Sequence, residues 1–180
     1  MSYTIEDLTS IDDAIFDTLW DASFPRIESG GTMPWAKYEV HSGHTLTEEE
    51  KKEILHLEFA NYLEDPGPEL KVLLTRKDGI PVRMMNWRYN LDEGIAIGYY
   101  QLLGPDANGS RGWLFDPELL QQLQDLFISE FGATAHTGMV VTGSPIHNYY
   151  VTRDVGGVLA EMTSVDNDGI STLTFTYNIE

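Results

Sequence analysis

Cysteine is absent from this 180-residue sequence. The fold therefore contains no disulfide bond and no metal site built on thiolates. The sequence also lacks any apolar run of about 18 residues, the length that a membrane-spanning helix needs. Its first residues, MSYTIEDL, carry neither the basic nor the apolar region of a signal peptide. We therefore expect a cytoplasmic protein that has no membrane partner.

Basic residues are scarce. The chain has 11 lysines and arginines against 29 aspartates and glutamates, which gives a formal net charge of -18. A surface with this charge repels nucleic acid and anionic membranes, so we expect neither as a partner. The same charge would attract a cationic substrate.

The composition and the hydrophobic patterning predict one packed α/β domain over residues 1–180. Alternating apolar residues predict strands, and apolar residues spaced three or four apart predict helices. The expected strands cover residues 3–8, 70–76, 81–90, 95–103, 135–142, 158–165 and 171–179. The expected helices cover residues 11–22, 48–63, 117–131 and 145–154. These elements predict a mixed, mainly antiparallel sheet of six to seven strands flanked by helices.

We expect residues 94–131 to organise the fold. The strand over 95–103 is apolar on both faces, which is typical of a central strand covered on two sides. Asp116 and Pro117 predict the start of the next helix, and Gly132 predicts its end. A glycine-bearing loop between a strand and a helix is a common place for an anionic ligand.

Two further segments leave alternatives open. Residues 28–43 are rich in glycine and aromatics and predict a long loop, in which Met33, Trp35 and Tyr38 form either a lid or a plug at the rim of the core. In the strand over 81–90, methionines and aromatics form either a partner-binding face or two sides of a covered sheet. Arg83 and Arg88 lie on opposite faces of that strand, so we expect neither face to be fully buried there.

The expected element order, β-α-α-β-β-β-α-β-α-β-β, resembles that of the GCN5-related N-acetyltransferases, the GNAT superfamily. Local likeness extends over residues 3–20, 72–85 and 148–162. The resemblance implies a GNAT-like acyl-CoA N-acyltransferase fold. It also implies transfer of an acetyl group from acetyl-CoA to an amine, either a small molecule or a protein.

The resemblance also implies roles for particular residues. In the superfamily, a splayed strand offers main-chain groups to the pantetheine arm, and the following loop wraps the pyrophosphate. The cofactor-binding residues implied here are Gln101, Leu102, Leu103, Asn108, Gly109, Ser110, Arg111, Gly112 and Asn148. Tyr150 is implied as the acid that protonates the leaving thiolate, and Glu93 is a candidate base for the amine. No metal is expected.

The loop departs from the superfamily pattern, because residues 108–112 place two glycines as Gly-x-x-Gly instead of Gln/Arg-x-x-Gly-x-Gly/Ala. Asp116 would also cap the helix end that otherwise binds phosphate, and its charge would repel a diphosphate. These departures favour an alternative, a catalytically inactive GNAT-like scaffold. Such a scaffold would be an interaction or structural protein, for example a virion-associated phage protein, with a protein partner or a homo-oligomeric state. The sequence leaves both hypotheses open.

Overall fold

The structure is a computed structural model, and it describes residues 2–27, 35–65, 69–152 and 159–178. Within these residues, seven strands form one sheet in the order β1-β2-β3-β4-β5-β7-β6. Neighbouring strands are antiparallel except β4 and β5, which are parallel. The predicted α/β class and the mixed, mainly antiparallel sheet are confirmed.

The elements have the following bounds. The strands are β1 (Tyr3–Asp7), β2 (Leu70–Lys77), β3 (Ile80–Asn90), β4 (Ile95–Leu103), β5 (Ala135–Val141), β6 (Leu159–Asn167) and β7 (Ile170–Tyr177). The helices are α1 (Asp13–Ile27), α2 (Trp35–Ser42), α3 (Glu48–Glu64), the short 3-10 helix η1 (Gly112–Phe115), α4 (Pro117–Phe131) and α5 (Pro145–Thr152). None of the helices in the described residues has the length and apolar character needed to cross a membrane.

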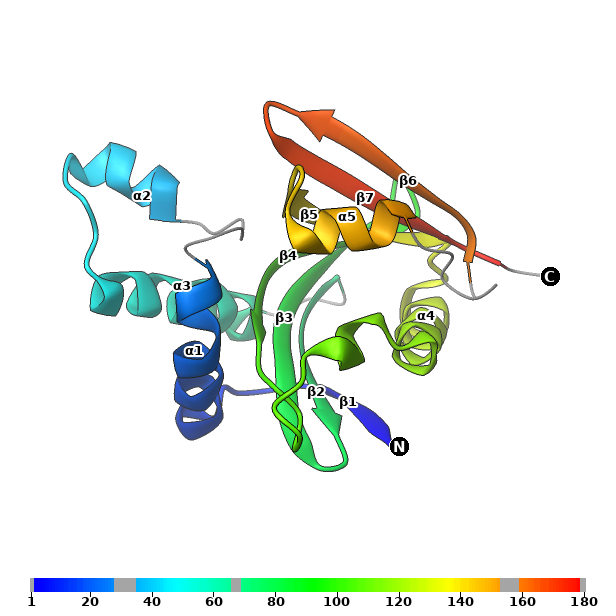
Figure 1. The fold of residues 1–180 in the computed structure, drawn as a ribbon, viewed down its shortest axis with the longest axis horizontal. Helices are drawn as coiled ribbons and strands as arrows, with labels where there is room; N and C mark the ends of the chain where they lie inside the picture. The colour runs from blue at the N-terminus through cyan, green and yellow to red at the C-terminus, as the bar shows by residue number, and fades with distance from the viewer. Residues whose placement is uncertain (1, 28–34, 66–68, 153–158, 179–180) are drawn as a thin grey trace.

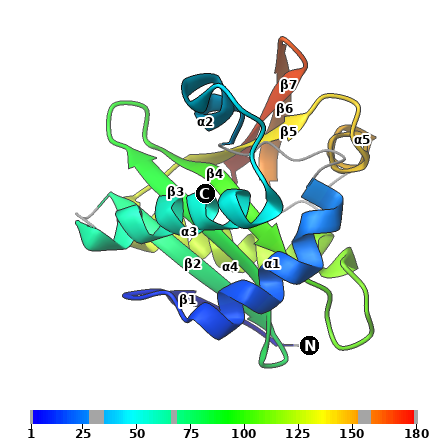
Figure 2. The same cartoon turned by 90° about the vertical axis from the view of Figure 1, so that its left-hand side faces the viewer.

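Helices cover both faces of the sheet (Figures 1 and 2). Figure 2 shows α1 and α3 in front of strands β2 to β4 and α4 behind them. On the first face, Phe16 of α1 and Phe59 of α3 belong to one core cluster with residues of β2, β3 and β4. On the opposite face, Leu123 and Phe127 of α4 pack with Trp87 of β3. Met84 of β3 therefore lies in one core layer and Met85 and Trp87 lie in the other, as expected for a sheet that is covered on both faces.

Local signals set several helix ends as predicted. Thr47 and Glu50 form a capping box at the start of α3. The Asp116 side chain caps α4, and Gly132 ends it with a left-handed φ of 64°.

The start of α1 differs from the prediction. The sequence predicts a helix that begins at Ile11, with the Ser10 side chain as its cap. Instead Oδ1 of Asp12 accepts the N–H of Ile15 at 3.1 Å, and the helix begins at Asp13. A carboxylate binds a helix N-terminal N–H at least as well as a hydroxyl does, so the two neighbouring candidates competed for one position.

The end of α1 also differs. Pro25 predicted an end near Ala22, but the helix continues to Ile27. The Ser23 hydroxyl donates to the Leu103 carbonyl at 2.8 Å and accepts the Leu103 N–H at 2.7 Å. These two bonds tie the last turns of α1 to the end of β4, so a tertiary contact outweighs the local signal for a helix end.

Part of the predicted loop over residues 28–43 is helical, because α2 covers Trp35–Ser42. Residues 28–34, with Met33, lie outside the described residues. The Trp35 ring packs edge-on to Trp20 at 6.2 Å, and the Tyr38 hydroxyl donates to Glu58 at 3.1 Å. These contacts match a plug at the rim of the core better than a lid.

Gly98 allows β4 to pass close to two large side chains of β3. A Cβ at Gly98 would lie 2.3 Å from Cε of Met85 and 3.0 Å from Cζ3 of Trp87. We expect Gly98→Ala to lower the free energy of unfolding by about 1–3 kcal/mol, because the packed core must shift.

Denaturant unfolding measures this loss. Gly138→Ala on β5 is the matched control, because a Cβ there meets no atom within 4 Å. The control should change the free energy of unfolding by less than about 0.5 kcal/mol. Equal losses in the two variants would contradict the packing argument.

Candidate functional site

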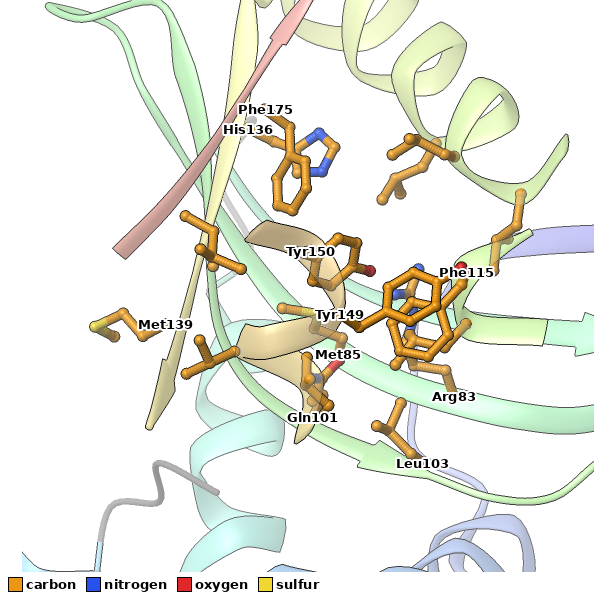
Figure 3. A pocket seen from close by; sticks show the side chains of 18 of the residues that line it. Arg83, Met85, Gln101, Leu103, Phe115, His136, Met139, Tyr149, Tyr150 and Phe175 are labelled. Carbon is orange, nitrogen blue, oxygen red and sulfur yellow. The ribbon is translucent and has the colours of Figure 1, made fainter. Parts of the chain in front are cut away.

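Strands β4 and β5 pair only along their first residues. The parallel pairs are Ile95–Ala135, Ala96–His136 and Ile97–Thr137. Beyond these pairs the strands separate (Figure 3), while β4 stays paired with β3 and β5 with β7. The sheet therefore opens near its centre while each of the two strands keeps one partner.

A β-bulge stands next to this opening. The register between β3 and β4 shifts between Met85 and Trp87, so β4 carries one extra residue there. Oδ1 of the buried Asn86 accepts the N–H of Tyr100 at 2.8 Å and so satisfies an amide that the bulge takes out of the ladder. Bulges bend a strand and increase its twist, which explains why β4 leaves β5 at this level.

A cavity of about 620 Å³ lies in the opening, on the α4 side of the sheet (Figure 3). Its walls come from β3, β4, β5, β7, η1, α4 and α5, and they are mostly apolar. We call this cavity the splay pocket. Met85 and Trp87 form part of its floor, and Phe175 of β7 lines another side.

Aromatic contacts join η1 to α5 across the splay pocket. The Phe115 ring stacks on Tyr149 with centroids 3.5 Å apart, and it meets Tyr150 edge-on at 5.3 Å. Tyr150 also packs edge-on against Phe175 at 5.1 Å. η1 lies in a segment that the sequence predicts as part of a loop, so the element that covers the pocket was not predicted.

Arg83 lies in the splay pocket with only 8% of its surface exposed, whereas Arg88 on the same strand is exposed. The expectation that neither face of β3 is fully buried is therefore wrong for the face that carries Arg83. Among the residues that the structure describes, none forms a hydrogen bond or an ion pair with the Arg83 guanidinium. Burial lowers the pKa of Arg83, but an arginine keeps its charge in proteins.

Two neutral groups lie near this charge. Burial raises the pKa of Tyr150 to about 12, and the charge of Arg83 acts in the opposite direction. Burial, with a smaller contribution from Arg83, lowers the pKa of His136 to about 3. Nδ1 of His136 lies 2.8 Å from the Tyr177 hydroxyl. At neutral pH the pocket therefore holds a phenol that can donate a proton and an uncharged imidazole.

The loop after β4 is folded around its own carboxylate. Oδ1 of Asp106 accepts the N–H of Asn108 at 2.9 Å and that of Ser110 at 3.0 Å. The Asp106 carbonyl accepts the N–H of Gly109 at 3.0 Å, and Nζ of Lys77 donates to the other carboxylate oxygen at 2.8 Å. A phosphate that bound these amides would have to displace the Asp106 side chain.

A second carboxylate occupies the start of α4, as the sequence predicted. Oδ1 of Asp116 accepts the N–H of Glu118 at 3.0 Å, and Oδ2 accepts the Tyr3 hydroxyl at 2.8 Å. Burial and this bond raise the pKa of Tyr3 above its ordinary value. The helix end therefore already has an anionic partner from its own chain.

About half of the residues implied by the superfamily resemblance lie at the splay pocket. Those that line it are Gln101, Leu103, Arg111, Gly112 and Tyr150. Nη2 of Arg111 also donates to the Ala22 carbonyl at 2.7 Å, which ties the loop to α1.

The other implied residues lie elsewhere. The Leu102 side chain is buried on the opposite face of the sheet, in the cluster formed with α1 and α3. Residues 108–110 are exposed in the loop, outside the pocket lining. Glu93 is exposed in the turn before β4, and the exposed Asn148 donates its side-chain N–H to the Gly143 carbonyl at 3.1 Å.

Arg83, Phe115 and His136 line the pocket but were not predicted to do so. A signal for Arg83 was present, because Arg83 is in phase with Met85 and Trp87 on an alternating strand. An arginine in such a row shares a face with large apolar side chains. Phe115 and His136 have no comparable signal, since their position depends on how distant elements meet.

No protein-family model and no curated protein sequence matches this chain. Solved structures match its fold over nearly its whole length. The N-acetyltransferase PaiA from Thermoplasma acidophilum, in complex with coenzyme A, has 14% identity and a TM-score of 0.54, with 99% of this chain and 100% of that chain covered.

Two further solved structures give the same result. Campylobacter jejuni N-acetyltransferase PseH with acetyl coenzyme A has 9% identity and a TM-score of 0.56, and the match covers 99% and 100% of the two chains. The spermidine N-acetyltransferase SpeG from Vibrio cholerae has 10% identity and a TM-score of 0.57, with 97% and 93% covered. The chain thus has the GNAT fold, and the predicted resemblance to that superfamily is confirmed at the level of architecture.

The Asp106 contacts predict a pH dependence of stability. Lys77 and the loop amides lower the pKa of Asp106, so the unfolded chain binds a proton there more readily than the folded chain does. The stabilisation from Asp106 is therefore present at neutral pH and is lost on acidification below about pH 4.

We expect the melting temperature of Asp106→Asn to fall less steeply than that of the wild type between about pH 5 and pH 3. Thermal unfolding across this range provides the measurement. Asp92→Asn, in an exposed turn, is the control and should keep the wild-type slope. A wild-type slope in Asp106→Asn would contradict the proposed role of the loop carboxylate.

Proposed function

We propose that this protein is a GNAT-type N-acetyltransferase that transfers the acetyl group of acetyl-CoA to an amine. The observation that carries the proposal is the separation of β4 from β5, which creates an apolar pocket of about 620 Å³ with a half-buried tyrosine, Tyr150, on one wall. Solved structures with the same fold include an N-acetyltransferase with coenzyme A and one with acetyl coenzyme A.

The splay pocket fits the neutral part of such a donor. A pantetheine arm is long and uncharged, and a mostly apolar cleft with a few polar groups suits it. The residues placed to hold the donor are Gln101 and Leu103 on β4 and Arg111 and Gly112 at the end of the loop. The loop itself does not offer its amides to a diphosphate while Asp106 occupies them, so we expect weak binding of the nucleotide end.

Tyr150 is the proposed acid. When bound, acetyl-CoA supplies an acetyl group as a thioester, and the thiolate that leaves needs a proton. Tyr150 holds its proton at neutral pH, since burial raises its pKa to about 12. The charge of Arg83 favours the phenolate that remains after the proton is donated.

The acceptor is proposed to arrive as a neutral amine. Of the described carboxylates, Asp116 alone lines the pocket, and its oxygens accept bonds from Tyr3 and Glu118. Glu93 lies outside the pocket lining, so we no longer propose it as the base. We propose that the amine loses its proton to solvent before it enters. The net charge of -18 favours a cationic acceptor near the surface, either a small polyamine or a protein amine.

The catalytically inactive scaffold remains as the negative outcome of the experiments below. The similar structures described above are N-acetyltransferases by name, and none of those names mentions a phage or a virion.

The first test is binding of acetyl-CoA, measured by isothermal titration calorimetry. Gly138 of β5 is paired with Leu173, a residue that lines the pocket, so a side chain added at Gly138 points into the pocket. We expect Gly138→Leu to weaken binding by about tenfold or more, because it fills space that the donor needs.

Thr174→Leu is the matched control. Thr174 lies next to Leu173 on β7, so its side chain points to the opposite face of the sheet. This variant should bind acetyl-CoA as the wild type does. No detectable binding by the wild type at millimolar acetyl-CoA would overturn the proposed function and leave the inactive scaffold.

The second test examines Tyr150 as the proposed acid. We expect Tyr150→Phe to lower kcat by about a hundredfold or more with little change in KM, because general acid catalysis is lost while packing is retained. Release of the free thiol with spermidine as the acceptor measures the rate. Tyr89→Phe is the control, because its ring stacks on Phe131 away from the pocket. An unchanged kcat in Tyr150→Phe would show that Tyr150 only anchors α5.

A further inference from the structure

Arg83 is a buried cation that the described part of the protein leaves without a counter-ion. Its guanidinium lies in the splay pocket, and only 8% of the residue is exposed. A buried charge without a partner is strongly destabilising, and buried charges in native proteins are usually paired. Asp116, the one described carboxylate in the pocket lining, forms no ion pair with Arg83 and instead accepts bonds from the Tyr3 hydroxyl and the Glu118 backbone N–H.

Other donors that line the splay pocket also lack an acceptor. Nε1 of Trp87 is buried and has no hydrogen-bond partner among the described residues. The Tyr150 hydroxyl has none within the same part of the chain either. Figure 3 shows Arg83 and Tyr150 among the side chains that surround the pocket. A buried donor such as Nε1 of Trp87 is expected to have a partner, so the pocket has a place for acceptor atoms that the described residues do not supply.

We propose that the splay pocket binds an apolar chain that ends in a carboxylate, and that this carboxylate pairs with Arg83. One guanidinium balances one negative charge, and its planar fork matches a carboxylate through two parallel hydrogen bonds. A diphosphate would bring more charge than one cation neutralises. The apolar walls formed by Met85, Leu123 and Phe175 suit the rest of the chain.

The carboxylate has two possible sources, and both present the same chemistry to Arg83. A free carboxylic acid would bind without coenzyme A. A CoA thioester whose acyl chain ends in a carboxylate would bind through both parts, and in that form the inference rests on the proposed function. In that reaction the carbon–sulfur bond breaks and a carbon–nitrogen bond forms. The amine proton goes to solvent, the Tyr150 proton goes to the thiolate, solvent returns a proton to Tyr150, and the distal carboxylate is unchanged.

The first experiment compares hexanoate with hexanol by calorimetry. We expect the wild type to bind hexanoate about tenfold to a hundredfold more tightly than Arg83→Met does, as is typical when a charged hydrogen-bonded pair is lost. Hexanol, which lacks the charge, should bind Arg83→Met at least as well as the wild type. Arg88→Met is the matched control, because Arg88 is exposed on the same strand, and it should bind hexanoate as the wild type does.

Stability provides an independent readout in the same variants. Without ligand, Arg83→Met should melt at a higher temperature than the wild type, because methionine removes an unpaired buried charge and keeps much of the volume. If Arg83→Met fails to fold, Arg83→Lys keeps the charge without the planar fork and should bind hexanoate several-fold more weakly. If the wild type and the Arg83 variant that folds bind hexanoate with equal affinity, the proposal that a free carboxylic acid binds at Arg83 is overturned.

The second experiment compares succinyl-CoA with acetyl-CoA, which share the same nucleotide. The wild type should bind succinyl-CoA more tightly, and Arg83→Met should lose this preference. If hexanoate binds through Arg83 and neither thioester binds, the proposed function fails and the carboxylate site stands. If acetyl-CoA binds and neither carboxylate probe depends on Arg83, the carboxylate site fails and the proposed function stands.

Discussion

The short parallel contact between β4 and β5 is the constraint on which the rest of the structure depends. It ends after Ile97 and Thr137, and the bulge opposite Asn86 turns β4 away. The sheet stays intact at this separation because β4 remains paired with β3 and β5 remains paired with β7, both in antiparallel fashion. The opening is then covered on one side by α4 and by the contact of Phe115 with Tyr149, which leaves a pocket that is partly open to solvent.

The charges around this pocket are arranged unusually for a protein of net charge -18. Asp106 and Asp116 occupy the loop and the helix end, the two places where the superfamily resemblance puts the diphosphate. Arg83 lines the same pocket and has no counter-ion among the residues that the structure describes. Its low exposure makes this single charge more effective toward an anion than it would be on the surface.

Most of the fold could be predicted from the sequence, whereas the site could be predicted only in part. Alternation placed Leu173, Phe175 and Tyr177 on the buried face of β7, and the apolar residues of β4 marked a central strand. The end of α1 was mispredicted because Ser23 bonds to β4, a contact that no local pattern reveals. The pocket residues Gln101, Leu103 and Tyr150 followed from the resemblance. Arg83, in contrast, was assigned to a face of β3 that was not expected to be fully buried.

The sequence by itself determined the elements whose signals are short in range. Helix ends are set by bonds to backbone groups within a few residues, as at Thr47 with Glu50, at Asp116 and at Gly132. These ends can therefore be predicted from neighbouring residues in the sequence. Only the tertiary structure decided that Arg83 is buried while Arg88 is exposed. Alternation assigns the two side chains to opposite faces, but both faces carry buried residues, and Arg88 is exposed although Met84 and Asn86 on its own face are buried. The burial of Arg83 depends on residues of α4, α5 and η1 that line the same pocket and are distant from β3 along the chain.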